Sequence, residues 1–489
     1  MNKYVLVAIA FVFFIILSDN VSAGTNGDAP QEGQDWIITQ DTHVWDEHIS
    51  VKNIIVNVGS GLKLENVNLT SVGQIQIRAD SQWINSTIYH DKETLDDNIS
   101  LYNELELINT NLTMNATDEY DGTNSNVFFV SKDARLIIRD YDGDKNTLDD
   151  RSFVRGDNSH VTNESLVNSH SITIGGCVSS ACDNQVGDID ISNIVVENSF
   201  FENIYALRIY GNDTYIRNST FNNSGFIVST GDNTVFTNNT MTNSWTFWEL
   251  VIPYGNNALI ADNNLSNGSA GFGLYKSENN IVRDNICNNY VGYCLRLDNT
   301  NNTLVSNNFF SNKTSYASLI IDQGNNNIVE GNIFFNTSGG DDTVRINGNF
   351  NTVKDNYFEK CGYNGNWYNT CIELCPYCFG HTSVILMNNI TNNKFVNSSS
   401  GITLLSNVEH TNVIGNHFLG PEISRPNLAG IFPLRYPATY GGNYTKAPSN
   451  NTFENNFITN VGIGISFDFY DSPFGPGGYG NIVRNNTIT

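Results

Sequence analysis

The chain has 489 residues, of which 39% are hydrophobic and only 15% charged, so it can bury a continuous apolar core and is not kept disordered by charge repulsion. Its 25 basic and 50 acidic residues give a formal net charge of −25, which argues against nucleic acid as a partner because phosphate binding needs a basic surface. The acidity suits either divalent cations or simple solubility.

Residues 1–23 have the features of a secretory signal peptide. A basic start is followed by an apolar run over residues 4–17, which is too short for a comfortable membrane span. Residues 21–23, Val-Ser-Ala, resemble a small-residue cleavage site, so the mature chain is expected to begin at Gly24. No later apolar run is long enough to cross a bilayer, and we therefore expect a secreted or cell-surface protein.

An exported chain can be glycosylated at Asn-X-Ser/Thr sequons, of which the mature sequence has about 20. An Asn-rich repeat also produces sequons by chance, so full occupancy is not expected. The acceptor sites singled out are Asn68, Asn111, Asn218, Asn238, Asn301, Asn336, Asn397 and Asn485.

Residues 24–189 contain short apolar runs of irregular spacing. The runs 36–39, 62–64 and 75–77 are short and apolar-rich, which predicts strands. We expect N-terminal capping and irregular coils in this region.

Residues 140–150 place oxygen-bearing side chains on alternate positions, as Ca²⁺ loops of the thrombospondin or EF-hand kind do. The Gly comes two residues earlier than in the EF-hand pattern, and a bidentate Glu is missing. The run is therefore either a Ca²⁺ site or a solvated acidic turn. The candidate metal ligands are Asp140, Asp142, Asp144, Asn146, Asp149 and Asp150.

From residue 190 to residue 489 one motif recurs: an apolar residue, two variable residues, Asn, one variable residue and another apolar residue. Asn285 and Asn308 occupy its fourth position at an interval of 23 residues, and the register extends from Asn239 to Asn486. A base period of 20–24 residues is typical of one coil of a β-solenoid.

Each coil also has a second apolar stretch, such as Leu295-Arg296-Leu297, whose alternation puts apolar residues inside and polar residues outside. Identical residues at one corner of successive coils stack about 4.8 Å apart, so we expect a ladder of hydrogen-bonded amides. Ser replaces Asn in the motif at Ser199 and Ser219. Insertions are expected near 361–381, 421–448 and 471–479.

The Asn motif resembles the parallel β-helix repeat of pectate-lyase-like proteins, including NosD-like carbohydrate-binding and sugar-hydrolase β-helices. The resemblance covers residues 190–489 strongly and 36–189 weakly. It implies an all-β fold, a right-handed parallel β-helix with loop insertions. It is specific for fold and not for activity, since that superfamily mixes lyases, hydrolases, epimerases, adhesins and non-catalytic scaffolds.

Eight cysteines in an exported chain predict disulfides. Cys177 and Cys182 can close one loop, while Cys287 and Cys294 flank one turn of a coil. The other four fall in one insertion, where two disulfides are expected, with a zinc site or a redox-active dithiol as alternatives. These four are Cys361, Cys371, Cys375 and Cys378.

Charged residues in the second stretch of adjacent coils form a candidate sugar site. In β-helix lyases an Arg or Lys acts as a base beside acid-bound Ca²⁺, and hydrolases of this fold use paired carboxylates. The Asp-Asp pair here lacks the Gly-His-Gly partner of the hydrolases, and the Asp-Pro-His motif of the epimerases is missing. The alternative is a surface charge ladder between coils. The candidate residues are Arg296, Asp298, Asp322, Arg345, Asp341 and Asp342.

Aromatic residues gather in the insertions, where their faces can either stack on sugars or pack the loops against the solenoid. The insertions fall at two different corners, so their loops are expected to wall the outer face of the second stretch into a trough. The candidate ligand-binding aromatics are Trp367, Tyr368, Tyr436 and Tyr440.

Three functions follow from these features. The first is a secreted or cell-surface scaffold that binds carbohydrate or acts as an adhesin, and the missing catalytic motifs favour it. The second is a polysaccharide lyase or glycoside hydrolase acting on an acidic polysaccharide, with Ca²⁺ as the one expected cofactor. The third is a structural component of a cell envelope or filament. The pattern runs up to Thr489, from which end-to-end or homo-oligomeric stacking is also expected.

Overall fold

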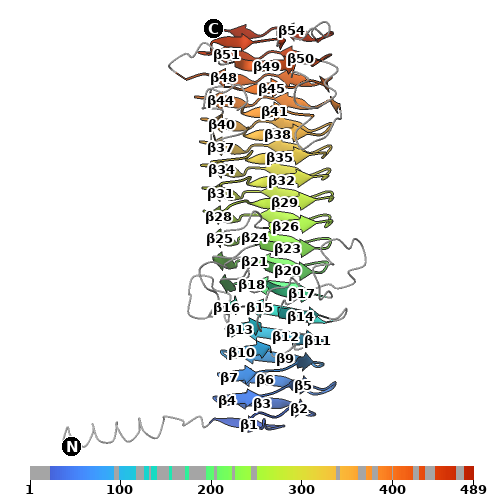
Figure 1. The fold of residues 1–489 in the computed structure, drawn as a ribbon, viewed down its shortest axis with the longest axis vertical. Helices are drawn as coiled ribbons and strands as arrows, with labels where there is room; N and C mark the ends of the chain where they lie inside the picture. Colours follow the sequence, from blue (N-terminus) through green and yellow to red (C-terminus); the bar gives the residue numbers. More distant parts are fainter. Residues whose placement is uncertain are drawn as a thin grey trace, which may run out of the picture.

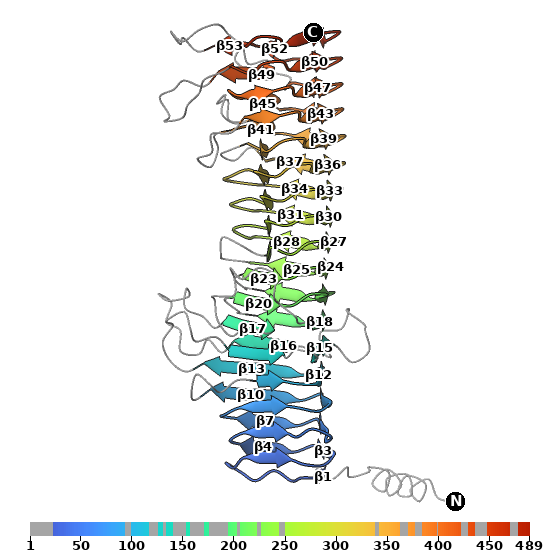
Figure 2. The ribbon, with the colours of Figure 1, turned by 90° about the vertical axis from the view of Figure 1, so that its right-hand side faces the viewer.

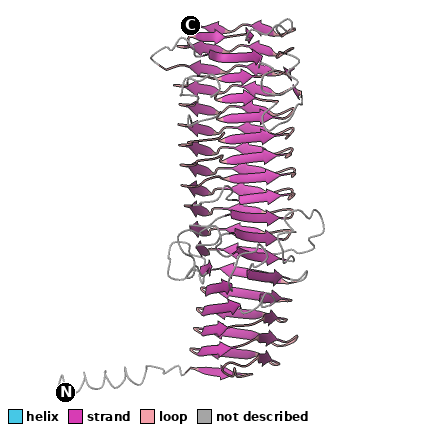
Figure 3. Cartoon of the chain, viewed as in Figure 1, coloured by secondary structure: helices cyan, strands magenta, loops and turns pink. Residues whose placement is uncertain are grey.

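A computed structural model describes a column of short strands and, within the residues it describes, no helix (Figures 1 and 3). The described ranges are 23–92, 99–116, 126–130, 134–139, 153–156, 171–175, 194–202, 206–222, 226–243, 250–337, 342–361, 370–376, 384–398, 400–421, 429–435, 447–469 and 478–489. The all-β prediction is confirmed for this part of the chain.

The chain winds through three parallel sheets, which we number 1, 2 and 3 in the order in which each coil visits them (Figures 1 and 2). Each strand pairs with the equivalent strand of the next coil, as β30 (Ile281–Arg283) does with β33 (Leu304–Ser306), where Val282 lies opposite Val305. The predicted parallel solenoid is therefore the observed architecture.

The strand bounds follow this order. Sheet 1 holds β2 (Trp36–Ile38), β5 (Ile54–Val56), β8 (Ile75–Ile77), β11 (Ile99–Leu101), β14 (Asn126–Val130), β17 (Ser171–Gly175), β20 (Ala206–Tyr210), β23 (Phe226–Thr230), β26 (Leu250–Pro253), β29 (Phe272–Tyr275), β32 (Leu295–Asp298), β35 (Leu319–Asp322), β38 (Val344–Asn347), β41 (Ile372–Leu374), β45 (Ile402–Leu404), β49 (Ala429–Arg435), β52 (Ile463–Ile465) and β53 (Asp468–Phe469). Sheet 2 holds β1 (Gly24–Asn26), β3 (Thr42–Trp45), β6 (Leu62–Glu65), β9 (Ser81–Ile84), β12 (Glu104–Ile108), β15 (Arg135–Arg139), β18 (Ile194–Glu197), β21 (Tyr215–Arg217), β24 (Val235–Thr237), β27 (Leu259–Ala261), β30, β33, β36 (Ile328–Glu330), β39 (Thr352–Lys354), β43 (Asn389–Thr391), β47 (Asn412–Ile414), β50 (Thr452–Glu454) and β54 (Ile482–Arg484). Sheet 3 holds β4 (His48–Val51), β7 (Asn68–Ser71), β10 (Thr87–Lys92), β13 (Asn111–Ala116), β16 (Phe153–Gly156), β19 (Phe200–Glu202), β22 (Thr220–Asn222), β25 (Thr240–Thr242), β28 (Asn264–Ser266), β31 (Ile286–Asn288), β34 (Phe309–Ser311), β37 (Ile333–Phe335), β40 (Tyr357–Glu359), β44 (Lys394–Val396), β48 (His417–Leu419), β51 (Phe457–Thr459) and β55 (Thr487–Ile488).

Two smaller features complete the column. Strand β1 pairs with β3 in the antiparallel sense, unlike all the other pairs of described strands. Strands β42 (Ile385–Leu386) and β46 (Val408–Glu409) form a separate two-stranded sheet.

None of the described residues forms a helix of the length and apolarity needed to cross a membrane.

The corner between sheets 2 and 3 explains the Asn motif. Asp284 takes a left-handed φ of 56° and turns the chain, which short polar residues tolerate better than others. The next residue, Asn285, is buried, and its backbone N–H and side-chain amide both donate to Oδ1 of Asn308, at 3.0 and 2.9 Å. The same amide donates to the carbonyl of Ile260 in the preceding coil. The predicted ladder is thus confirmed.

A second Asn ladder lies at the corner between sheets 1 and 2. Backbone N–H of Asn327 donates to Oδ1 of Asn351 at 2.9 Å, and that of Asn351 donates to Oδ1 of Asn388 at 2.8 Å. All three side chains are fully buried. Two buried amide columns therefore fix both corners that flank sheet 2.

The interior contains one continuous apolar core. On sheet 3 the inward row is a stack of phenylalanines, where Phe334 lies 4.7 Å from Phe358 between ring centroids with an interplanar angle of 8°. Phe395 and Phe418 continue the stack at 4.5 Å. The parallel register places like residues over like, so each coil repeats the packing of the one before.

Candidate functional site

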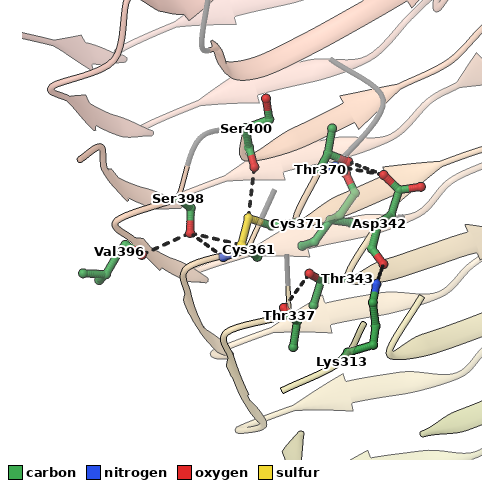
Figure 4. Close-up of a disulfide and its surroundings, with 11 residues drawn as sticks. Lys313, Thr337, Asp342, Thr343, Cys361, Thr370, Cys371, Val396, Ser398 and Ser400 are labelled. Carbon is green, nitrogen blue, oxygen red and sulfur yellow. Dashed lines mark hydrogen bonds between the residues drawn. A yellow bond between two sulfur atoms is a disulfide. The ribbon is translucent and has the colours of Figure 1, made fainter. Parts of the chain in front are cut away.

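The two described disulfides join cysteines that the sequence predicted to be oxidised. Cys287 pairs with Cys294, and both sulfurs lie inside the column, since Cys287 occupies the inward row between Leu265 and Phe310. Cys361 pairs with Cys371 at the junction from sheet 3 to sheet 1 (Figure 4). Cys375 is also disulfide-bonded. Oxidised sulfurs are not thiolate ligands, so the disulfide prediction is preferred over the zinc alternative for this insertion.

The outward face of sheet 1 brings the predicted charged residues together. Along one row Gly273, Arg296, Ile320, Arg345 and Glu373 lie opposite one another in successive coils. The row two residues further along each strand contains Tyr275, Asp298, Asp322 and Asn347. Strand alternation points both rows away from the core.

Arg296 joins two coils of this face. Its guanidinium NH2 lies 2.8 Å from Oδ2 of Asp298 on its own strand and 3.4 Å from Oδ2 of Asp322 on the next. Asn347 donates to Oδ1 of Asp322 at 3.0 Å, which holds that carboxylate from the other side. Asp322 and Asn347 are buried, whereas the side chains of Arg296 and Asp298 are 21% and 20% exposed. The buried Asp322 and Asn347 therefore fix the orientation of Arg296, which holds Asp298 at the surface.

Two tyrosines border Arg296. Its guanidinium carbon lies 5.9 Å from the ring centroid of Tyr275. A Cβ at Gly273 would lie 2.7 Å from that ring, so the tyrosine rests where only glycine leaves space. Tyr275 and Tyr293 interact through their hydroxyls; burial raises the pKa of Tyr275 to about 12 and also raises the pKa of Tyr293. Both phenols stay protonated at neutral pH.

Arg345 belongs to a second, more deeply buried part of the face. Its NH2 and Nε lie 2.7 and 3.2 Å from Oδ2 of Asp342, and its Nε lies 3.2 Å from Oε2 of Glu373. The other carboxylate oxygen of Asp342 accepts from the backbone N–H and the hydroxyl of Thr370, while Nζ of Lys313 donates to its carbonyl (Figure 4). Asp342 is fully buried, so it anchors the segments around it.

The two tyrosines of this face suit binding better than proton abstraction. A general base must be unprotonated near neutral pH, and the raised tyrosine pKa values oppose that. Each arginine is held by two carboxylates, which leaves fixed N–H donors and carboxylate acceptors for a polar ligand. Within the described ranges no three His, Cys, Asp or Glu side chains are placed to hold a metal ion.

Several candidate residues lie outside the described residues. These are the residue 140–150 run with its metal ligands Asp140, Asp142, Asp144, Asn146, Asp149 and Asp150, the loop aromatics Trp367, Tyr368, Tyr436 and Tyr440, the cysteines Cys177, Cys182 and Cys378, and Asp341. The expected trough walls lie largely there as well.

Sequence reasoning missed Tyr275, Tyr293, Asn347 and Glu373. Asn347 and Glu373 had a usable signal, since each follows the same apolar alternation as Asp322 and Arg345 in its own strand. The two tyrosines had no such signal in the sequence, because the position of the Tyr275 ring depends on the space left by Gly273, which has no side chain.

Comparison with known proteins places this geometry in context. Residues 205–344 match the family model described as the right handed beta helix region. No curated protein matches the chain. The A-module of a mannuronan C-5 epimerase from Azotobacter vinelandii is similar at 12% identity, covering 74% of this chain and 88% of its own, with a TM-score of 0.36.

Two further solved structures are similar at comparable levels. A variant of the periplasmic alginate epimerase AlgG has 11% identity over 76% of this chain and 82% of its own, with a TM-score of 0.35. The Dettilon tailspike protein has 15% identity over 74% of this chain and 62% of its own, with a TM-score of 0.32. At these identities the likeness concerns the fold alone.

Proposed function

We propose that the chain, which is a right-handed parallel β-helix as its repeat predicted, is a secreted scaffold that binds carbohydrate without catalysis. The binding face is the outward side of sheet 1 from β29 to β41. The solenoid supplies a rigid support, and the polar residues of this face supply the contacts.

The observation that carries the proposal is the layered arrangement around Arg296. The half-buried Arg296 and Asp298 offer a donor and an acceptor at the surface, and Asp322 and Asn347 hold them from below. Groups held in place before a ligand arrives lose less side-chain entropy when it binds. Tyr275 adds an aromatic ring beside the arginine.

The net charge on the outward face of sheet 1 indicates whether a charged or a neutral glycan can bind there. Two arginines stand among four carboxylates, those of Asp298, Asp322, Asp342 and Glu373. A polyuronate would meet excess negative charge, whereas sugar hydroxyls can donate to carboxylates and accept from the guanidinium. We therefore propose a neutral, hydroxyl-rich glycan as the ligand.

Export is part of the proposal. The disulfides Cys287–Cys294 and Cys361–Cys371 support it, because such bonds persist in oxidising compartments. The signal-peptide features of residues 1–23 and the sequons support the same proposal.

Calorimetric titration of the chain from Gly24 with neutral tetraoses of glucose, mannose and galactose, and with tetragalacturonate, tests the proposal. We expect a neutral tetraose to bind and Arg296→Ala to weaken that binding about tenfold or more, since a charge-assisted hydrogen bond is lost. The matched control is Arg283→Ala on sheet 2, where the arginine pairs with Asp284 and is 43% exposed. Equal affinity of Arg296→Ala and wild type, at equal melting temperature, would place binding elsewhere.

A further inference from the structure

A groove of about 450 Å³ opens on sheet 2 at the N-terminal end of the column, far along the chain from the sheet 1 face. Strands β3, β6 and β9 and the corners that precede them form it, together with Glu104 at the start of β12 and Asn26 of β1. Its volume lies in the range of small-ligand sites. We infer that this groove is a second carbohydrate site, which takes a short neutral oligosaccharide.

The floor of the groove contains a glycine that lies between Asp41 and Asp80. Gly61 lines it, and a Cβ there would lie 3.0 Å from the carbonyl of Asp80 and 3.5 Å from Oδ1 of Asp41. Backbone N–H of Gly61 donates to Oδ1 of Asp41 at 2.9 Å, which fixes that carboxylate. Asp80 is exposed and has no hydrogen bond or ion pair with any residue that the structure describes, so its oxygens are open to a ligand.

Donors stand along the outward row of the same strands. His43, Lys63 and Gln82 lie opposite one another on β3, β6 and β9. Oε2 of Glu65 accepts from Nζ of Lys63 at 2.9 Å and lies 3.1 Å from Nε2 of His43, so it holds both side chains in place. The hydrogen bond from Lys63 lowers the pKa of Glu65, which keeps that carboxylate charged at neutral pH.

The acidic residues of the groove do not form an ion site. Asp41, Asp80 and Glu104 belong to three different coils, and no three His, Cys, Asp or Glu side chains of the described chain converge as metal ligands. Successive strands lie about 4.8 Å apart, so the four strands span roughly 14 Å. Separated acceptors along a groove of this length fit an extended ligand with many hydroxyls.

The charges that line the groove indicate which class of ligand it can bind. Asp41, Asp80 and Glu104 face the groove against the single ammonium group of Lys63, which already pairs with Glu65, and this disfavours a polyuronate. Glu104 also lies 3.5 Å from Arg135. Hydroxyl groups can donate to Asp41 and Asp80 and accept from Lys63 and Gln82. A neutral oligosaccharide satisfies both sets.

The test uses the Arg296→Ala variant as background, because the proposed sheet 1 binding is already weakened there. The groove substitutions leave the sheet 1 face unchanged, so a further loss of binding on this background reports the groove. We expect one of the same neutral tetraoses to bind this background at one site. Adding Asp80→Ala or Lys63→Ala should weaken it about tenfold or more. Glu278→Ala, which removes an exposed carboxylate outside the groove on the same background, should leave the affinity unchanged.

Three results would overturn the inference: no neutral tetraose binds the background, both groove variants bind as the background does, or tetragalacturonate binds more tightly than the neutral tetraoses. Melting temperatures equal to that of the background exclude unfolding as a cause of lost binding. The sheet 1 proposal is judged separately, by the difference between wild type and Arg296→Ala.

Discussion

At the scale of single residues, Tyr275 makes a prediction about alkaline pH. Its folded pKa is raised to about 12, above the ordinary value of 10.0, because burial disfavours the phenolate. A raised pKa means that the neutral form stabilises the fold. That contribution is complete below pH 10 and is lost as the pH rises towards 12.

Absorbance titration of the folded protein checks this prediction. We expect Tyr275→Phe to remove one tyrosine that ionises near pH 12 and to flatten the fall in stability between pH 10 and 12. Tyr254→Phe is the control, because it removes a tyrosine directly after β26, the strand that pairs with the strand of Tyr275. Loss of a tyrosine titrating near pH 10 on changing Tyr275 would contradict the described burial.

Asp342 and Asp298 both belong to the sheet 1 face, but Asp342 is buried and Asp298 faces solvent, so their substitution should cost different amounts of stability. Asp342 is fully buried beneath Arg345 and Thr370, so Asp342→Ala should cost about 3–5 kcal/mol of unfolding free energy. Asp298 is 20% exposed, and Asp298→Ala should cost about 1 kcal/mol or less. Urea unfolding measures both, and equal losses would contradict the anchoring role of Asp342.

The sequence could predict part of this site. Arg296, Asp298 and Arg345 stand at outward positions of an alternating pattern, which is visible without a structure. Their partners could not be predicted, because the contact of Arg296 with Asp322 depends on the register between two coils. The burial of Asp342 depends on Thr370, which lies 28 residues away.

At the scale of the elements, the Asn ladder predicts different effects of two substitutions. Oδ1 of Asn332 accepts from the backbone and side-chain N–H of Asn308, and its amide donates to the carbonyl of Val305. Asn332→Leu would bury these groups without partners and should cost about 2 kcal/mol or more.

Asn332→Ser is the matched control. In the same row Ser219 accepts from the backbone N–H of Ser199 at 3.1 Å, so a serine can replace part of the ladder. We expect its loss in urea unfolding to be well below that of Asn332→Leu. If leucine were tolerated as well as serine, hydrogen bonding would not be what holds this corner.

The two ladders show how far the repeat could be read from sequence. The motif ladder was predicted because its Asn recurs beside two apolar positions. The second ladder was missed, although Asn327 and Asn351 each lie five residues before a member of the first. Those five residues are the length of one strand plus one corner. The spacing predicts a second ladder only if both corners of sheet 2 are known to be buried.

The Cys287–Cys294 disulfide makes a prediction for one coil. It closes a short loop with a sequence separation of 7, and both cysteines are fully buried. Replacing both by alanine should cost roughly 2–3 kcal/mol by the loop-closure model. Mass mapping without reductant should find this pair and Cys361–Cys371, and mild reductant should leave the buried pair intact in the folded protein. Free thiols at either pair would contradict the assignment.

At the scale of the whole molecule, the column keeps the two proposed sites apart. The groove starts at β3 and the sheet 1 face at β29, nine coils further on, so their starts lie roughly 43 Å apart along the axis at about 4.8 Å for each coil. Parallel pairing between neighbouring coils makes the column stiff in this direction. One chain could then hold two glycan strands at a set distance.

The central claim is that this β-helix binds a neutral glycan and leaves it intact. The most direct measurement incubates the chain from Gly24 with neutral glucan, mannan and galactan, and follows retention on the polysaccharide and new reducing or unsaturated ends in the same sample. We predict retention on at least one polysaccharide, reduced by Arg296→Ala, with no new ends. New ends, or no retention on any neutral polysaccharide, would contradict it.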